Sequence, residues 1–463
     1  MNSLVTLAEV SRTYKPTNLN EEIKLKLYKR RWGILFLYVL YMVCNSSQWL
    51  QYSIIPNAVM RFYKISYWQV DLTSLIVMIC YVSLALPAAN FMDKMNLRWI
   101  AIIGSCGTAA GSWVKVFSAS PDRFYITLIG QAIVGIAQVV MLSVPQKLSS
   151  IWFGEKEVSS ACSIGVFGFQ SGIVVGFFLP PILVQNHEDI EIIGVYFYKM
   201  FLYFALASSF AAVMVLLFFK ASPRLPPTMS QARLRSQKVA EDETGYVRTL
   251  KRLFSQRHLT ALFVTTGVNN GCFNALSTLL SQIILEYFPG CEEDAGRIGV
   301  TMVVFGMTAS VIFGLILDRT KKFKFVLIFI YYMSAVAMLC FTMLCYIKSV
   351  FWMYIAAAFV GTFLCGFTAV SFEVATELTF PESELIVGTI MNMSSLLFTF
   401  VATVSFGYIN QNVGYFWGNI GFVITLVLGS SLSLPIEFSL RRTTAQRIRV
   451  NLYDGLEMGE CVD

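Results

Sequence analysis

Aromatic and amide side chains interrupt apolar stretches at three points of the chain. The first is the segment Gln48–Tyr52, the second is the pair Phe169 and Gln170, and the third is the segment Asn269–Asn274. Aromatic faces attract cations, and neutral amides both donate and accept hydrogen bonds. Such side chains suit the binding of a small polar or cationic solute. The sequence has no GxxxxGKS or GxxxxGKT loop and no recognisable catalytic or metal-ligand motif, so we expect no enzyme activity, cofactor or metal.

The composition places these side chains inside a membrane. Hydrophobic residues make up 56% of the 463 positions and charged residues only 14%, against about 25% charged residues in soluble domains. That balance excludes a soluble protein. The apolar runs are continuous and of spanning length, which indicates helices rather than the alternating strands of a barrel. We therefore predict an all-α membrane protein.

Apolar runs of spanning length recur twelve times. We predict spans at roughly 32–55, 70–91, 99–117, 124–146, 160–184, 197–219, 259–285, 297–317, 325–347, 350–373, 385–410 and 416–438. The charged, proline-containing segment 220–258 divides them into two sets of six. The predicted units are an N-terminal tail (1–31), a first six-helix bundle (32–219), a linker (220–258), a second bundle (259–438) and a C-terminal tail (439–463).

Charge predicts the orientation. Of the 35 Lys and Arg residues, seven fall on the side away from the termini: Arg61, Lys64, Lys115, Arg123, Lys199, Arg297 and Lys348. By the positive-inside rule, both termini are then cytoplasmic. The net charge of +7 is explained by this topology, so we expect no nucleic-acid partner. We expect a monomer in the plasma membrane, with an organellar membrane as the alternative.

Two pairs of loops repeat at nearly one offset. Ala89-Asn-Phe-Met-Asp93-Lys94 recurs as Gly314-Leu-Ile-Leu-Asp318-Arg319, offset by 225, and Glu155 and Glu157 recur as Glu382 and Glu384, offset by 227. The Gly-x-x-x-Asp-Arg unit and the long linker resemble the major facilitator superfamily, which implies two bundles related by pseudo-twofold symmetry. In that family such loops latch the helix ends. We therefore assign a cytoplasmic gate, with loop solubility as the alternative, to Asp93, Lys94, Arg98, Gly314, Asp318 and Arg319.

A closer resemblance covers essentially the whole membrane domain. The segments 47–54, 160–173, 275–280, 295–299 and 377–384 resemble, in order, the feline leukaemia virus subgroup C receptor family. The resemblance implies a carrier for choline and ethanolamine; haem export is an older assignment for the same family. It also implies four substrate contacts. Trp49 and Gln170 match the family, whereas Asn274 stands in place of a tyrosine and Leu396 in place of a glutamine.

The repeat offset pairs the same positions, because 225 added to 49 gives Asn274 and 226 added to 170 gives Leu396. Substrate in such transporters lies where equivalent positions of the two repeats face each other. Phe169 and Phe273 are possible replacements for the missing aromatic wall, and Asn274 suits an amine, hydroxyl or amide group. The full set of candidate substrate-binding residues is Trp49, Gln51, Tyr52, Met78, Tyr81, Phe169, Gln170, Asn270, Phe273, Asn274 and Leu396.

Each candidate has a structural alternative. Trp49 is also typical of an interfacial aromatic belt, Gln170 of a hydrogen bond between packed helices, and Met78 and Tyr81 of core packing. The asparagines of segment 269–274 indicate either a cavity lining or a break in the seventh helix.

Few titratable residues fall within the spans. We expect Asp71 to lie at an outer helix end and Lys115 to extend from its outer end toward the lipid headgroups. Without a midplane acid, uncoupled alternating-access diffusion of a choline-like or ethanolamine-like cation is the predicted function. A haem exporter is the first alternative, although His187 and His258 both fall in loops or at a helix mouth. A non-transporting sensor or receptor is the second.

Overall fold

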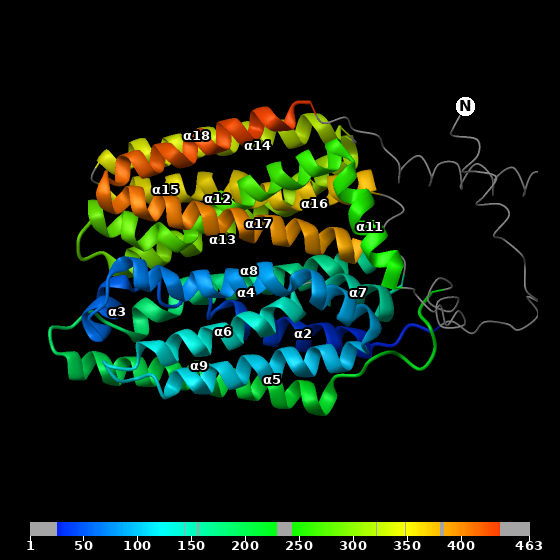
Figure 1. Cartoon of the computed structure of the whole chain (residues 1–463), viewed down its shortest axis with the longest axis horizontal. Helices are drawn as coiled ribbons and strands as arrows, with labels where there is room; N and C mark the ends of the chain where they lie inside the picture. Colours follow the sequence, from blue (N-terminus) through cyan, green and yellow to red (C-terminus); the bar gives the residue numbers. More distant parts are fainter. Residues whose placement is uncertain are drawn as a thin grey trace, which may run out of the picture.

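The structure, a computed structural model, describes residues 26–142, 144–154, 157–228, 243–320, 322–347, 349–379 and 384–435. Within these ranges the helices lie side by side in two bundles (Figure 1). Most of the predicted N-terminal tail, the middle of the linker and the whole C-terminal tail lie outside the described residues. The side chains of three predicted gate residues, Asp93, Lys94 and Asp318, also lie outside the described part.

The described helices divide between an N-terminal half, a C-terminal half and one linker helix. The N-terminal half contains α2 (Arg30–Ser46), α3 (Pro56–Tyr63), α4 (Tyr67–Lys94), α5 (Leu97–Val116), α6 (Phe124–Met141), α7 (Val144–Trp152), α8 (Val158–Leu183) and α9 (Ile190–Phe218). The linker contributes α11 (Glu243–Ser255). The C-terminal half contains α12 (Arg257–Tyr287), α13 (Glu292–Thr320), α14 (Phe323–Leu344), η1 (Cys345–Ile347), α15 (Val350–Val360), η2 (Gly361–Cys365), α16 (Gly366–Thr379), α17 (Glu384–Asn412) and α18 (Tyr415–Ser433).

The two halves meet along two pairs of helices. Helix α4 packs against α17, and α8 packs against α13. In the predicted repeat α4 is equivalent to α13 and α8 to α17, so the two contacts are related by the pseudo-twofold axis. One cluster of buried apolar side chains extends through both halves. We call the end where α2 begins and α18 ends the terminal end, and the opposite end, which carries α3, the far end (Figure 1).

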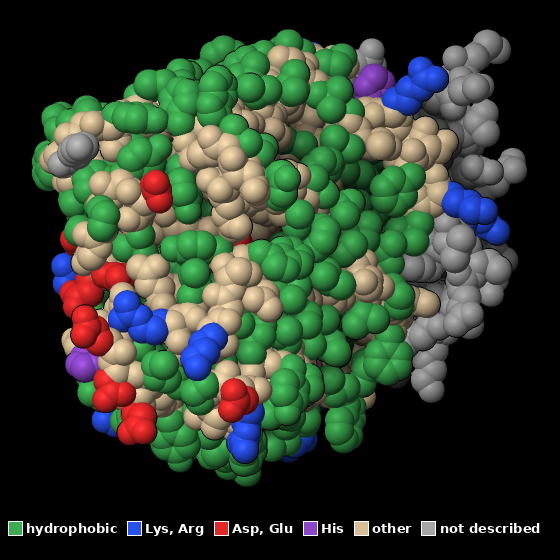
Figure 2. Space-filling view, turned by 60° about the vertical axis from the view of Figure 1, so that its left-hand side comes forward, with side chains coloured by type: hydrophobic (Ala, Val, Ile, Leu, Met, Phe, Trp, Pro, Cys, Tyr) green, Lys and Arg blue, Asp and Glu red, His purple; other side chains and the backbone are tan. Residues whose placement is uncertain are grey.

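The surface is that of a protein surrounded by lipid. Nine helical stretches of the described chain are long and apolar enough to cross a membrane. Figure 2 shows a broad surface of hydrophobic side chains, with most of the charged ones gathered at its edges. Helix α2 has only 17 residues, and α5 and α12 carry many small or polar residues. With these three helices, each of the twelve predicted spans corresponds to a helical segment.

The first predicted span, 32–55, is wrong as an uninterrupted helix. Helix α2 ends at Ser46, residues 47–55 form turns, and α3 starts at Pro56. Proline lacks the N–H of a helical hydrogen bond, and its ring clashes with the carbonyl four residues earlier, here that of Tyr52. Pro56 therefore stops the helix from running through and starts a new one, a position proline favours. Trp49 lies within this break, not on a helix.

The tenth predicted span, 350–373, also departs from a regular helix. A five-residue π-helical segment, η2, joins α15 to α16. It begins at Gly361, where a Cβ would lie 1.9 Å from the carbonyl oxygen of Met302. Only glycine allows α13 to approach so closely at this position. Single π-helical turns inside α-helices are frequent at functional sites.

The expectation for Lys115 is wrong. Its side chain is 1% exposed, and Nζ donates a 3.1 Å hydrogen bond to Oε1 of Gln131 on α6. A lipid-facing lysine would have reached the headgroups, but this one points into the N-terminal half. Gly130 makes room for it, because a Cβ there would lie 2.5 Å from Cγ of Lys115.

Candidate substrate-binding site

The break after α2 is held by side chains of neighbouring helices. The carbonyl of Gln48 accepts a hydrogen bond from Gln131 (3.0 Å), that of Trp49 from Ser74 (3.1 Å), and that of Ile54 from Ser281 (2.9 Å). A broken helix frees backbone carbonyls that water cannot reach within a membrane, so other groups must satisfy them. Three helices, α6, α4 and α12, do so here. They fix the position of Trp49.

Trp49 faces an aromatic partner on α8. The ring centroids of Trp49 and Phe169 lie 6.1 Å apart with an interplanar angle of 30°. Trp49 is 2% exposed, so it does not lie on the lipid-facing surface. Two polar atoms are buried without a hydrogen-bond partner among the described residues. They are Nε1 of Trp49 and Oε1 of Gln170, the residue that follows Phe169 on α8. The α2 break and α8 therefore present two aromatic rings and two unsatisfied polar atoms.

The asparagine-rich helix α12 is continuous from Arg257 to Tyr287, so the alternative of a break at Asn269–Asn274 is wrong. Nδ2 of Asn274 donates to Thr399 (3.4 Å), and that of Asn270 to Ser395 (3.4 Å), both on α17. Oδ1 of Asn270 accepts from Thr368 on α16 (2.9 Å). The asparagines thus fasten α12 to its neighbours.

Asn274 has open space beside it. In the fully described stretch of α12 from Thr265 to Leu285, every residue is buried except Asn274, which is partly exposed. Its Nδ2 is engaged by Thr399, which leaves Oδ1 for a ligand. Leu396, where the family pattern has glutamine, is 7% exposed and lies one turn from Thr399 on α17. An apolar side chain therefore stands near the asparagine amide.

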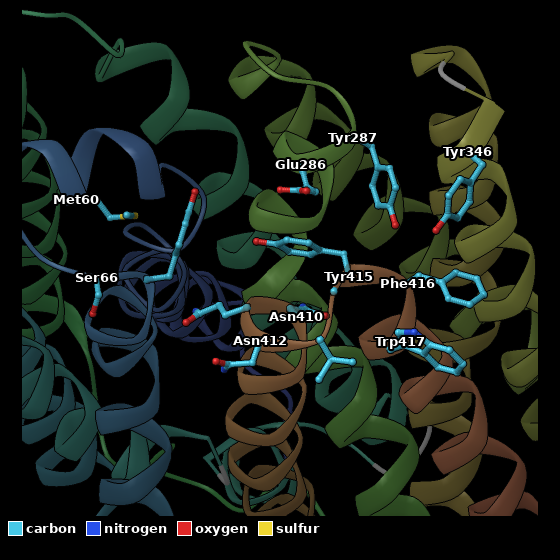
Figure 3. A pocket seen from close by; sticks show the side chains of 14 residues that line it. Met60, Ser66, Glu286, Tyr287, Tyr346, Asn410, Asn412, Tyr415, Phe416 and Trp417 are labelled. Carbon is cyan, nitrogen blue, oxygen red and sulfur yellow. The ribbon is translucent and has the colours of Figure 1, made fainter.

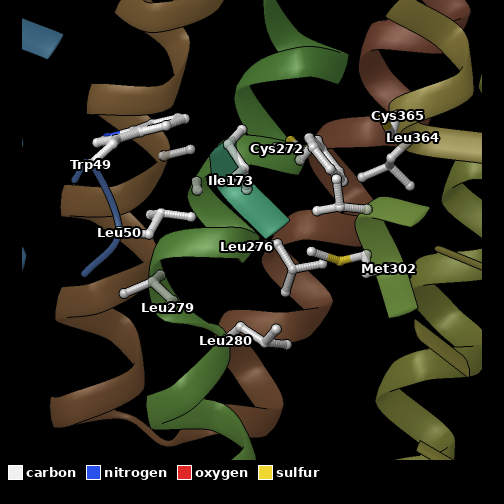
Figure 4. Packing of buried hydrophobic residues seen from close by; sticks show 14 of the residues in the cluster. Trp49, Leu50, Ile173, Cys272, Leu276, Leu279, Leu280, Met302, Leu364 and Cys365 are labelled. Atoms are coloured by element: carbon white, nitrogen blue, oxygen red, sulfur yellow. The ribbon is translucent and has the colours of Figure 1, made fainter. Parts of the chain in front are cut away.

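Most other candidates belong to the large apolar cluster that extends through both halves. Figure 4 shows Trp49, Leu50 and Ile173 packed together with Cys272 and Leu276 of α12. The same cluster contains Met78, Tyr81 and Phe273. Gln51 is buried in the break as well.

Tyr52 belongs to the same cluster but faces a different helix. Its ring lies 5.8 Å from that of Phe201 on α9, a helix that packs within the N-terminal half. The structure therefore places the Tyr52 side chain in the core of this half rather than beside α12.

The predicted gate is only partly described. Arg98 donates to the carbonyl of Leu216 at the end of α9 (3.2 Å), Arg319 is exposed, and a Cβ at Gly314 would meet nothing within 4 Å. Sequence reasoning missed Arg31, which forms a bidentate ion pair with Glu157 (2.9 and 3.0 Å). The sequence held a signal for this pair, because Glu157 belongs to one of the two repeated loops.

Polar contacts at the far end were also missed. Nε2 of Gln282 donates to Oδ1 of Asp71 (2.7 Å), and Glu292 accepts from Asn57 (3.3 Å) and Asn186 (3.4 Å). These bonds join the two halves, and Asp71 is only 4% exposed. It does lie near a helix end, as expected, but it is enclosed between the halves. For Asp71 and Gln282 the sequence held a signal, because each is a polar residue within an apolar run, on α4 and α12 respectively.

Residues 37–403 match the family model described as Major Facilitator Superfamily. The chain is 39% identical to the choline/ethanolamine transporter flvcr2b of Danio rerio over 91% of this chain and 87% of that protein. It is 38% identical to the choline/ethanolamine transporter FLVCR2 of Homo sapiens (91% and 80%) and 35% identical to the choline/ethanolamine transporter FLVCR1 of Felis catus (90% and 74%).

Two solved structures share the fold. A bacterial homologue of the human lysosomal transporter Spinster, inward-facing and unoccupied, superposes with a TM-score of 0.65 at 13% identity, covering 88% of this chain and 97% of that one. The transporter FucP in its outward conformation gives 0.62 at 12% identity, covering 88% and 99%. The predicted fold of two six-helix bundles is therefore confirmed.

Proposed function

Because this chain belongs to the major facilitator superfamily and, within it, to the feline leukaemia virus subgroup C receptor family, we propose that this multi-pass membrane transporter carries choline or ethanolamine. Its relatives named as choline/ethanolamine transporters support that substrate class. We further propose uncoupled, alternating-access diffusion. Both termini then lie in the cytoplasm and the far end faces outward at the plasma membrane. The units remain those predicted, 1–31, 32–219, 220–258, 259–438 and 439–463, in a monomer.

The observation that carries this proposal is the open space at Asn274 together with the Trp49–Phe169 pair. A quaternary ammonium ion has no N–H to donate and is held best against aromatic faces, each worth about 0.5–2 kcal/mol once water is excluded. Two rings stand 6.1 Å apart at the break. Phe169 thus supplies an aromatic wall on α8, in a site whose α12 position holds Asn274.

Asn274 tunes the choice between the two substrates. The free Oδ1 of an asparagine accepts a hydrogen bond from a primary ammonium group but not from a trimethylammonium group. Ethanolamine gains this interaction and choline does not. The site therefore favours ethanolamine more strongly than a site with tyrosine at this position.

Uncoupled transport remains our proposal although three charged residues of the described chain, Lys115, Asp71 and Glu377, are buried. Glu377 lies in the last turn of α16, at the terminal end. Lys115 is bonded within the N-terminal half, and Asp71 is bonded to Gln282 at the far end. Met78, a candidate site residue, lies two helical turns further along α4 than Asp71, about 10 Å. The membrane potential alone favours inward movement of a cation by about 2.3 kcal/mol per 100 mV.

An uptake panel tests the substrate class. Labelled choline, ethanolamine and haem are offered to cells that lack their own choline carriers, with wild type, Trp49→Ala and the control Trp99→Ala, which removes an exposed tryptophan. We expect saturable uptake of choline, ethanolamine or both by wild type and Trp99→Ala, and little by Trp49→Ala. Lack of uptake of both amines by wild type, or full uptake by Trp49→Ala, would overturn the proposal.

Two further measurements test the mechanism. Uptake should persist without sodium and with the pH gradient collapsed, and preloaded unlabelled substrate should accelerate entry of labelled substrate. A sensor shows no such counterflow, and a channel only dissipates the gradient. Strict dependence on sodium or on a proton gradient would replace uncoupled diffusion with coupled transport.

A further inference from the structure

A cavity of about 1040 Å³ opens at the far end, separate from the break that holds Trp49. The N-terminal half contributes the segment between α3 and α4 with Tyr67, and the C-terminal half contributes the ends of α12 and α17 and the start of α18. We call this cavity the vestibule. Figure 3 shows Glu286 close to Tyr415, whose phenol group points toward the Met60–Ser66 side of the space.

The lining of the vestibule combines negative charge with aromatic rings. Glu286 is the one charged side chain among its described lining residues, which also include Tyr67, Tyr287, Tyr415 and Trp417. Tyr415 and Tyr67 lie close enough to interact electrostatically with both Glu286 and the buried Asp71. A carboxylate attracts cations over several ångströms, and tyrosine and tryptophan faces bind them at contact.

Asn410 of α17 is buried at the edge of the vestibule. Asn410 lines the vestibule and is 2% exposed. Neither atom of its side-chain amide has a hydrogen-bond partner among the described residues. Its Oδ1 points at α18, where a Cβ at Gly418 would lie 1.8 Å from it, so the amide lies between α17 and α18 and does not face the open space.

The vestibule and the candidate substrate site lie along the same helices. On α12, Asn274, Gln282 and Glu286 follow one another over twelve residues, about 18 Å. On α4, Tyr67 is at the vestibule and Asp71 is one turn further in. The Asp71–Gln282 hydrogen bond between the halves therefore lies between the two places.

We propose that the vestibule is a second binding site for small organic cations, one that captures a substituted ammonium ion at the far end before the halves separate. The identity of the physiological ligand of this site rests on the proposed function. Glu286 supplies the attractive charge, and Tyr415 and Tyr67 supply aromatic faces. Capture at this site raises the local concentration of substrate at the Asp71–Gln282 contact.

Binding of tetramethylammonium to purified full-length protein tests the site without transport. Titration calorimetry is carried out on the Trp49→Ala protein, in which the central aromatic wall is lost, and again after adding Glu286→Gln or Tyr415→Leu. The control is Glu191→Gln, an exposed carboxylate on α9 that does not line the vestibule. We expect retained binding in Trp49→Ala and in the control, and binding weakened about fivefold or more by either vestibule change.

Uptake kinetics provide a second readout that does not depend on the Trp49→Ala protein. Glu286→Gln in the otherwise wild-type chain should raise KM for the transported amine about fivefold at low ionic strength and less at high salt, with a nearly unchanged maximal rate. Unchanged tetramethylammonium binding in both vestibule variants, together with an unchanged KM in Glu286→Gln, would overturn the inference. A further outcome is that wild type transports neither choline nor ethanolamine while Glu286→Gln still weakens tetramethylammonium binding. In that case the proposed function is wrong, and the assignment of the vestibule as a cation-binding site is supported.

Discussion

Gln282 of α12 donates a 2.7 Å hydrogen bond to Asp71 of α4, across the boundary between the two halves. Ser281, its neighbour, donates to the carbonyl of Ile54 in the α2 break. Consecutive residues of one helix thus hold both α4 and the break of the opposite half. Opening the far end must break both bonds, which couples the position of Trp49 to the separation of the halves.

Gln282→Ala should favour opening of the far end. The substitution leaves the Asp71 carboxylate enclosed without its partner, a state that costs about 1–3 kcal/mol or more until water enters. The more hydrated, open state is then favoured. We expect faster labelling of the far-end Cys291 by a membrane-impermeant maleimide, relative to wild type, and no labelling in Cys291→Ser. An unchanged labelling rate would contradict a role for this bond in closure.

Cys291 also reports on orientation and pH. Burial, together with the nearby carboxylates of Asp294 and Glu292, raises the pKa of its thiol above the ordinary value. Since the thiolate is the reactive form, labelling on intact cells should be slower than that of free cysteine at pH 7.5 and should rise as the pH increases. Asp294→Asn should speed labelling at neutral pH. Labelling only after the cells are permeabilised would reverse the proposed topology.

Phe169→Ala should distinguish choline from ethanolamine. Removing one of the two aromatic faces costs a trimethylammonium group more than a primary ammonium group, which retains the hydrogen bond to Asn274. We expect KM for choline to rise about tenfold and KM for ethanolamine to rise less, as measured by uptake. Val166→Ala, at an exposed position on the same helix, is the control. Equal effects on both substrates would contradict Phe169 as an aromatic wall.

Substitutions of Lys115 and of Gln131 should change the free energy of unfolding by very different amounts. Gln131→Ala removes the acceptor of the buried Lys115 ammonium group and the donor to the carbonyls of Gln48 and Thr73. The free energy of unfolding should therefore fall by about 3 kcal/mol. Lys115→Met removes the buried charge with little change in volume, and stability should stay within about 1 kcal/mol of wild type or exceed it. Thermal unfolding in detergent measures both. A larger loss for Lys115→Met than for Gln131→Ala would contradict this account.

Much of the candidate site could be found from residue types and the repeat alone. Trp49, Gln170 and Asn274 are polar or aromatic positions in apolar runs, and an internal offset pairs Trp49 with Asn274. The roles of Tyr52 and Lys115 could not be found in this way. Hydropathy places a residue within a span, but it does not tell which neighbouring helix its side chain faces.

The sequence by itself determined twelve apolar segments and their division into two repeated sets, because these depend on local composition and on comparison along the chain. The resemblance of five segments to a known family indicated the membership of the family. Only the tertiary structure decided that the first span breaks at Trp49, that Ser74, Gln131 and Ser281 satisfy the freed carbonyls, and that Asn274 alone keeps open space on its stretch of α12. These features depend on contacts between helices that are distant in the chain. A backbone break within a membrane persists only where such contacts replace the missing hydrogen bonds.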